Sequence, residues 1–118
     1  MSVMSIRAVV AFCLLVSVSA GVEAGDCIRD QSGNVVCGKG QCALDQYGKV
    51  LCAREGGGAI RDRFGTVRCG AGMCATDDNG RVMCSTQPGG GALRNAFGEV
   101  KCLGACEEAS EQRCERGG

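Results

Sequence analysis

The chain has 118 residues, of which 13 are basic, 13 are acidic and none is histidine. Proteins that bind nucleic acid, or that bind membranes through a basic patch, carry a one-signed charge, so this balance argues against both classes. Aromatic residues make up only 3% of the chain, whereas glycine occurs 20 times and cysteine 11 times. A chain with so few large apolar side chains needs covalent cross-links in place of a large core.

The first 24 residues are typical of a secretory signal peptide. Arg7 precedes thirteen uncharged, mostly apolar residues, 8–20, which are too few to span a bilayer. Cleavage after Ala20 or after Ala24 would satisfy the A-x-A-like rule, and we expect cleavage after Ala24. The sequence therefore predicts an exported protein, secreted or periplasmic, with no stable membrane insertion once residues 1–24 are removed.

The predicted mature chain, residues 25–118, forms one cysteine-rich domain. Its ten cysteines lie at 27, 37, 42, 52, 69, 74, 84, 102, 106 and 114. An even number of cysteines in an exported chain indicates a disulfide framework. We therefore expect disulfides here rather than metal-binding thiolates.

Five eleven-residue segments of this domain share one template. Each has Cys or Ala at position 1, an apolar residue at position 2, Asp or Asn at position 4, Gly at position 7, Val at position 9 and Cys at position 11. The segments are CIRDQSGNVVC (27–37), CALDQYGKVLC (42–52), AIRDRFGTVRC (59–69), CATDDNGRVMC (74–84) and ALRNAFGEVKC (92–102). They occur in pairs, which predicts two complete modules, 27–52 and 59–84, and an incomplete third, 92–114, starting 32 to 33 residues apart.

Each segment is typical of a β-hairpin. An Asp that accepts hydrogen bonds from turn amides, followed three residues later by a Gly with positive φ, forms a type I turn with a G1 bulge. Alternation along the strands places the valine at position 9 beside the cysteine of position 11, on the expected inward face. The sequence therefore predicts a small all-β, disulfide-rich fold: a tandem array of about five short hairpins with a short helical or irregular C-terminal tail.

Cysteines that face each other across such a hairpin lie within disulfide range. The disulfides predicted on this ground are Cys27–Cys37, Cys42–Cys52 and Cys74–Cys84. The remaining four cysteines would pair as Cys69–Cys102 and Cys106–Cys114. Residues 107–113 are typical of a helix, which would hold the last pair too far apart. A rival framework bridges the short loops between segments, with Cys37–Cys42, Cys69–Cys74 and Cys102–Cys106. Spacing alone leaves this choice open, and we favour the framework of bridges within hairpins.

Three aromatic residues are the first candidates for a binding surface. Tyr47, Phe64 and Phe97 each directly precede a turn glycine, at the tip of a predicted hairpin. An exposed row of rings could stack on sugars or dock a protein. In a chain with so little core, however, we expect each ring to fold back over a neighbouring hairpin.

Three arginines are the second candidates. Arg29, Arg61 and Arg94 occupy template position 3 of the first, third and fifth segments. Stacked in register, they could bind phosphate, carboxylate or sulfated glycans. Since Asp30, Asp62 and Asn95 follow directly and the chain is neutral overall, we expect a solvated face with local pairing instead.

The sequence contains no signature of catalysis or of a cofactor. Without histidine the commonest general base is absent, and there is no P-loop, dinucleotide-binding or nucleophile-elbow motif. We therefore predict no enzyme, but an exported, non-catalytic, disulfide-stabilised structural or binding protein, whose partner would be an unknown protein or glycan. The other interpretations are an exported effector or inhibitor-like peptide, and a cysteine-thiolate metal-binding protein.

Overall fold

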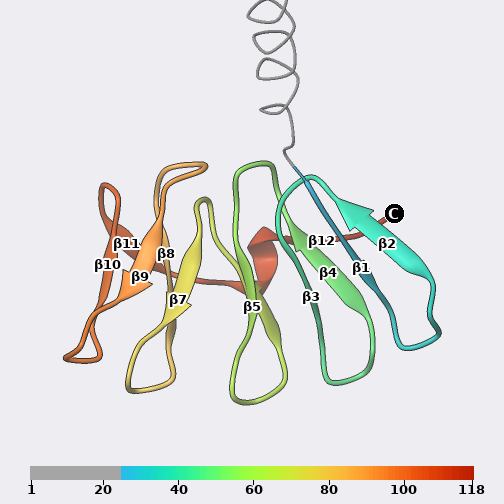
Figure 1. Ribbon diagram of the computed structural model, residues 1–118, viewed down its shortest axis with the longest axis horizontal. Helices are drawn as coiled ribbons and strands as arrows, with labels where there is room; N and C mark the ends of the chain where they lie inside the picture. The colour runs from blue at the N-terminus through green and yellow to red at the C-terminus, as the bar shows by residue number, and fades with distance from the viewer. Residues whose placement is uncertain (1–24) are drawn as a thin grey trace, which may run out of the picture.

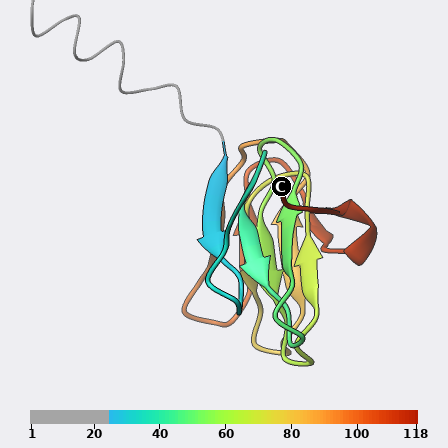
Figure 2. The ribbon, with the colours of Figure 1, turned by 90° about the vertical axis from the view of Figure 1, so that its right-hand side faces the viewer.

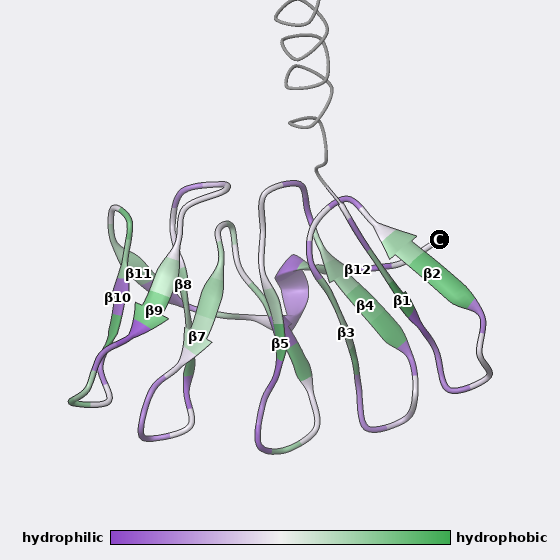
Figure 3. Ribbon diagram, in the orientation of Figure 1, coloured by the Kyte–Doolittle hydropathy of each residue, from purple (hydrophilic) through white to green (hydrophobic). Residues whose placement is uncertain are grey.

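The computed structural model describes residues 25–118 (Figure 1), and the predicted signal peptide, residues 1–24, lies outside the described residues. The described part is all-β and disulfide-rich, with twelve short strands and one 3-10 turn. The predicted fold class is therefore confirmed. Apolar residues are concentrated on the strands, whereas the turns are largely hydrophilic (Figure 3).

Ten of the strands pair antiparallel as five hairpins, which we number 1 to 5 in chain order. The pairs are β1 (Asp26–Arg29) with β2 (Val35–Gly38), β3 (Cys42–Leu44) with β4 (Val50–Ala53), β5 (Ala59–Arg61) with β6 (Val67–Cys69), β7 (Cys74–Thr76) with β8 (Val82–Ser85), and β9 (Ala92–Arg94) with β10 (Val100–Cys102). The hairpins stand side by side in a row with all five turns along one edge, which we call the tip edge (Figure 1). Seen along the row, the strands of successive hairpins superpose (Figure 2).

The turns have the predicted construction. In hairpin 1 the Oδ1 of Asp30 accepts hydrogen bonds from the amides of Ser32 (2.8 Å) and Asn34 (3.0 Å). The same two bonds recur in the other four hairpins, with Asn95 in place of Asp in hairpin 5. All five turn glycines have φ between 82° and 87°, a conformation that other residues rarely adopt.

The hairpins pack face to face, and the core lies between them. The Val67 and Cys69 side chains of hairpin 3 are buried against Ala43 and Leu51 of hairpin 2. The template valines of hairpins 2, 3 and 4 are 8%, 1% and 2% exposed. Val35 is 64% exposed because no hairpin precedes hairpin 1. The prediction that the template valine faces inward is therefore confirmed for hairpins 2, 3 and 4 and wrong for hairpin 1.

Glycine allows neighbouring hairpins to approach closely. At every junction the side chain at template position 5 lies against the turn glycine of the next hairpin. A Cβ on Gly65 would lie only 2.6 Å from the Cβ of Gln46, and one on Gly98 only 2.6 Å from the Cβ of Asp78. The repeated glycine is therefore needed for stacking as well as for the turn.

The C-terminal residues 106–118, which we call the strap, run back along four hairpins. Strand β11 (Cys106–Glu108) pairs with β8, and strand β12 (Cys114–Arg116) pairs with β4. Between them Ser110 pairs with Cys69 of hairpin 3, and after them Gly118 exchanges two backbone hydrogen bonds with Cys37 of hairpin 1. The strap lies along one side of the row (Figure 2). Only Glu111–Arg113 forms a 3-10 turn, so the helix expected over 107–113 is wrong: its first residues pair with β8 instead.

The structure contains five disulfides. Three lie within hairpins, as the template predicts: Cys27–Cys37, Cys42–Cys52 and Cys74–Cys84. The expected pairs Cys69–Cys102 and Cys106–Cys114 are wrong, because the strap brings Cys114 to Cys69 and the short loop after hairpin 5 joins Cys102 to Cys106. The latter bridge belongs to the rival framework.

A short repeat in the strap explains this connectivity. Residues 106–110 (CEEAS) and 114–118 (CERGG) share a Cys-Glu start and two small residues at the end. Each segment pairs with an even-numbered hairpin, and its cysteine bonds the final cysteine of the next hairpin, which has Ala59 or Ala92 at position 1. Hairpin 1, which no strap cysteine reaches, bonds its own Cys27. The final cysteine of a hairpin therefore bonds either a cysteine at position 1 of the same hairpin or a cysteine of the strap.

Candidate binding edge

The tip edge presents the three aromatic rings to solvent. Tyr47, Phe64 and Phe97 are 72%, 69% and 84% exposed, so the expected packing over neighbouring hairpins is wrong. The reason is that the side chain at position 5 already fills the space over the next turn, as Gln46 does over Gly65. The rings follow at position 6 and remain largely exposed.

The rings form an interrupted series. They occupy hairpins 2, 3 and 5, while hairpins 1 and 4 carry Ser32 and Asn79 at the same turn position. With the usual separation of stacked sheets, about 10 Å, the rings of hairpins 2 and 3 lie about 10 Å apart and that of hairpin 5 about 20 Å further on. The series therefore reads aromatic, aromatic, polar, aromatic along one line.

Hydrogen-bonding groups surround the rings. The guanidinium carbon of Arg63 lies 5.0 Å from the centroid of the Phe64 ring, within cation–π range. A cleft of about 430 Å³ opens between hairpins 2 and 3 and is lined by Gln46, Tyr47, Thr66 and strap residue Glu111, among others. A ligand that covered a ring would thus also meet amide, hydroxyl and charged groups.

The acidic residues of the turns are engaged by the protein itself. Partial burial alone would raise the pKa of Asp62, but hydrogen bonds from the Arg68 side chain (2.8 Å) and from backbone amides of the turn outweigh it and lower the pKa. The hydrogen bond from the amide of Arg81 is the main cause of the lowered pKa of Asp77, and burial opposes it. Both groups are carboxylates at neutral pH whose lone pairs already accept turn hydrogen bonds, a structural role.

The arginine candidates lie on the strands, in the last pair before each turn, whereas the rings lie in the turns. Arg29, Arg61 and Arg94 are exposed on the first strands of hairpins 1, 3 and 5, on the side that the strap does not cover. Within residues 25–118 none of them forms an ion pair, so the expected local pairing does not occur. Charged side chains on an uncovered strand edge discourage pairing with other chains, which is sufficient reason for their position.

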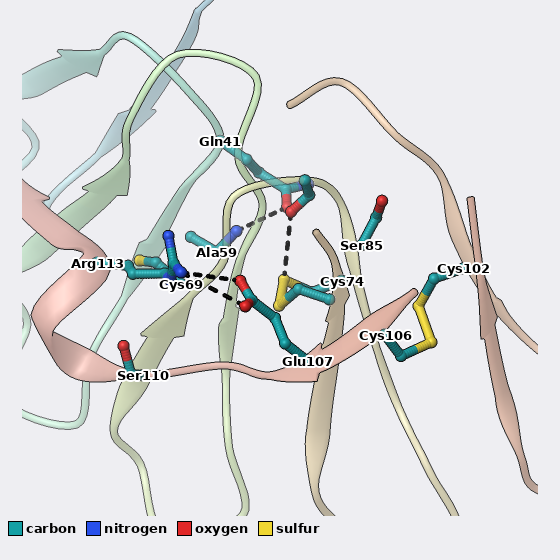
Figure 4. The surroundings of a disulfide bond; sticks show 12 residues. Gln41, Ala59, Cys69, Cys74, Ser85, Cys102, Cys106, Glu107, Ser110 and Arg113 are labelled. Carbon is teal, nitrogen blue, oxygen red and sulfur yellow. Dashed lines mark hydrogen bonds and ion pairs between the residues drawn. A yellow bond between two sulfur atoms is a disulfide. The ribbon is translucent and has the colours of Figure 1, made fainter. Parts of the chain in front are cut away.

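One buried polar group was not foreseen from the sequence. Glu107 of the strap faces Arg113 near Cys69 (Figure 4), and its Oε1 lies 3.1 Å from an Arg113 nitrogen. That oxygen is buried and makes no well-aligned hydrogen bond. The ion pair joins β11 to the 3-10 turn and so stabilises the bend of the strap. The sequence feature that could have drawn attention to Glu107 is the Cys-Glu repeat of the strap.

A second cleft lies among the loops at the edge opposite the tips. It measures about 790 Å³, and its lining includes Asp26, Glu55, Met73 and Pro88 together with several glycines. Backbone and two carboxylates make up most of its polar groups, and no feature of the template pointed to it.

All ten cysteines of residues 25–118 are in disulfides, so no thiolate is free to bind metal in this part of the chain. The described residues likewise contain no group of three or more Asp, Glu, His or Cys side chains that could hold a metal ion. No helix among them has the length and apolar character needed to cross a membrane. No protein-family model, curated protein or solved structure matches this chain.

Proposed function

We propose that this chain is an exported, non-catalytic binding protein whose contact surface is the tip edge. The observation that carries the proposal is the exposure of Tyr47, Phe64 and Phe97 on one edge of a disulfide-braced row. Aromatic residues are enriched at binding surfaces, and a chain with so few of them would bury them if folding required it.

The scaffold suits such a role. Three disulfides fix single hairpins, and two more join hairpins 3 and 5 to the strap that pairs with the others, so the rings are held at set positions before a ligand arrives. A surface fixed in advance loses little conformational entropy on binding. The disulfides also fit an oxidising compartment, which agrees with a secreted or periplasmic location.

The test replaces the rings by residues that the chain itself uses at the same turn position. Since Ser32 and Asn79 occupy that position in hairpins 1 and 4, a combined variant with Tyr47→Ser, Phe64→Asn and Phe97→Ser should keep the fold. We expect its free energy of unfolding to stay within about 0.5 kcal/mol of the native value, as for other surface substitutions. Its binding to isolated cell-envelope fragments of the source organism should be lost.

A matched control replaces Arg29, Arg61 and Arg94 by glutamine. These side chains are equally repeated and exposed but lie on the strands, in the last pair before each turn, and not in the turns themselves, so this variant should bind envelope fragments as the native protein does. Native-like binding by the ring variant would contradict the proposal. A loss of several kcal/mol of stability in the ring variant would also contradict it, because the rings would then belong to the core.

A further inference from the structure

We infer that the partner of the tip edge is an extended glycan with little net charge. The inference rests on the proposed function and names the class of its ligand. It depends on three properties of the edge: its narrowness, the chemistry between its rings, and the spacing of the rings along the row.

The tip edge is a line rather than a patch. Each hairpin contributes a single turn to it, and a polar turn separates Phe64 from Phe97 (Figure 1). A stable protein–protein interface covers about 800 Å² on each partner and has a contiguous apolar centre. A thin row of separate rings matches a polymer chain lying along the row better than a globular surface.

The chemistry of the edge matches a sugar. A pyranose ring has an apolar C–H face, which stacks on an aromatic ring, and a rim of hydroxyl groups. Beside the rings the edge offers the amides of Gln46 and Asn79, which can donate to and accept from such hydroxyls, and the guanidinium of Arg63, which can donate to them. At template positions 5, 6 and 8 the five turns carry three basic and two acidic side chains. Because these charges nearly balance, the edge has no particular electrostatic attraction for a polyanion.

The ring spacing predicts how affinity depends on chain length. Tyr47 and Phe64 lie on neighbouring hairpins, about 10 Å apart, so a short oligosaccharide can cover both. Phe97 lies two hairpins beyond Phe64, about 20 Å away, with the turn of Asn79 between them. Only a longer chain can therefore reach the third ring.

The first experiment identifies the class of ligand on the envelope fragments used above. Fragments are treated with periodate, which oxidises the vicinal diols of sugars, or with protease, and binding of the native protein is measured. We expect periodate to abolish binding and protease to leave it. If protease abolishes binding and periodate leaves it, the partner is a protein: the glycan inference then fails, while the proposed binding edge stands. If the ring variant binds untreated fragments like the native protein, both fail.

The second experiment tests the geometry with oligosaccharides released from the same fragments and separated by size. Tyr47→Ser or Phe64→Asn should weaken binding of short and long fractions alike, by about tenfold each. Phe97→Ser should weaken binding of the long fractions by a similar factor and leave the short ones unchanged. An equal effect of Phe97→Ser on all lengths would overturn the inference that the glycan lies along the row.

Discussion

Substitution of two equivalent turn glycines by alanine separates turn strain from stacking. Gly65 and Gly33 have nearly the same φ, 86° and 87°, so alanine costs about 1–2 kcal/mol of left-handed strain at either site. A Cβ on Gly33 meets nothing within 4 Å, whereas one on Gly65 would lie 2.6 Å from the Cβ of Gln46. Overpacking of that kind costs about 1–3 kcal/mol more. Gly65→Ala should therefore destabilise the protein by about 1–3 kcal/mol more than Gly33→Ala does.

Guanidinium unfolding of the oxidised protein, followed by far-UV circular dichroism, measures both free energies. Gly48→Ala is an internal control: its new methyl group would overlap the side-chain amide of Gln31, which can rotate away, so its cost should stay close to that of Gly33→Ala. Equal costs for Gly65→Ala and Gly33→Ala would refute the close stacking of hairpins 2 and 3.

Two further predictions concern the strap and a turn carboxylate. Replacing Cys69 and Cys114 by alanine should lower the free energy of unfolding by about 4 kcal/mol, and replacing Cys27 and Cys37 should lower it by about 3 kcal/mol. The reason is that the first bridge joins residues 45 apart and the second residues 10 apart. Guanidinium unfolding measures the difference, and equal losses would contradict it. The pKa of Asp62 is lowered from an unfolded value of about 3.9, so its contribution is complete above that pH and is lost as the pH falls through its folded-state pKa. The free energy of unfolding, measured from neutral to acid pH, should accordingly decline less in Asp62→Asn than in the native protein; parallel curves would argue against that contribution.

The hairpins could be predicted because their determinants are local. An Asp oxygen that accepts from amides two and four residues ahead, and a glycine at positive φ, fix each turn within one eleven-residue segment. The register then follows, and with it the opposition of Cys27 and Cys37. The exposure of the rings could not be predicted in this way. Whether the side chain at position 5 or the one at position 6 packs on the next hairpin depends on the turn of that hairpin, which lies outside the segment.

The strap could not be predicted from local pattern, since its partners are distant in sequence. Residues 107–113 have helix-favouring side chains, yet the first two of them belong to strand β11, because β8 offers an unpaired edge. A signal was nevertheless present: Ala59 and Ala92 leave two hairpins without an internal bridge, and the strap repeats its Cys-Glu start twice. Matching the two bridge-less hairpins to the two strap segments leaves two possible pairings, and the observed one joins Cys102 to Cys106, only four residues away, and Cys69 to Cys114.

Burial is weakest at the two ends of the row, and each end is held by a disulfide, which bears on the role of the rings. Inner hairpins are covered on both faces, whereas the outer face of hairpin 1 exposes Val35 and that of hairpin 5 leaves Leu93 77% exposed. Hairpin 1 has its own disulfide and the Gly118 backbone bonds, and hairpin 5 is joined to the strap by Cys102–Cys106. Glycine contacts, small apolar side chains and disulfides stabilise the row from end to end, and the folded row buries none of the three rings. Three rings left exposed along one edge of the row are the physical ground on which we propose that this edge binds a partner.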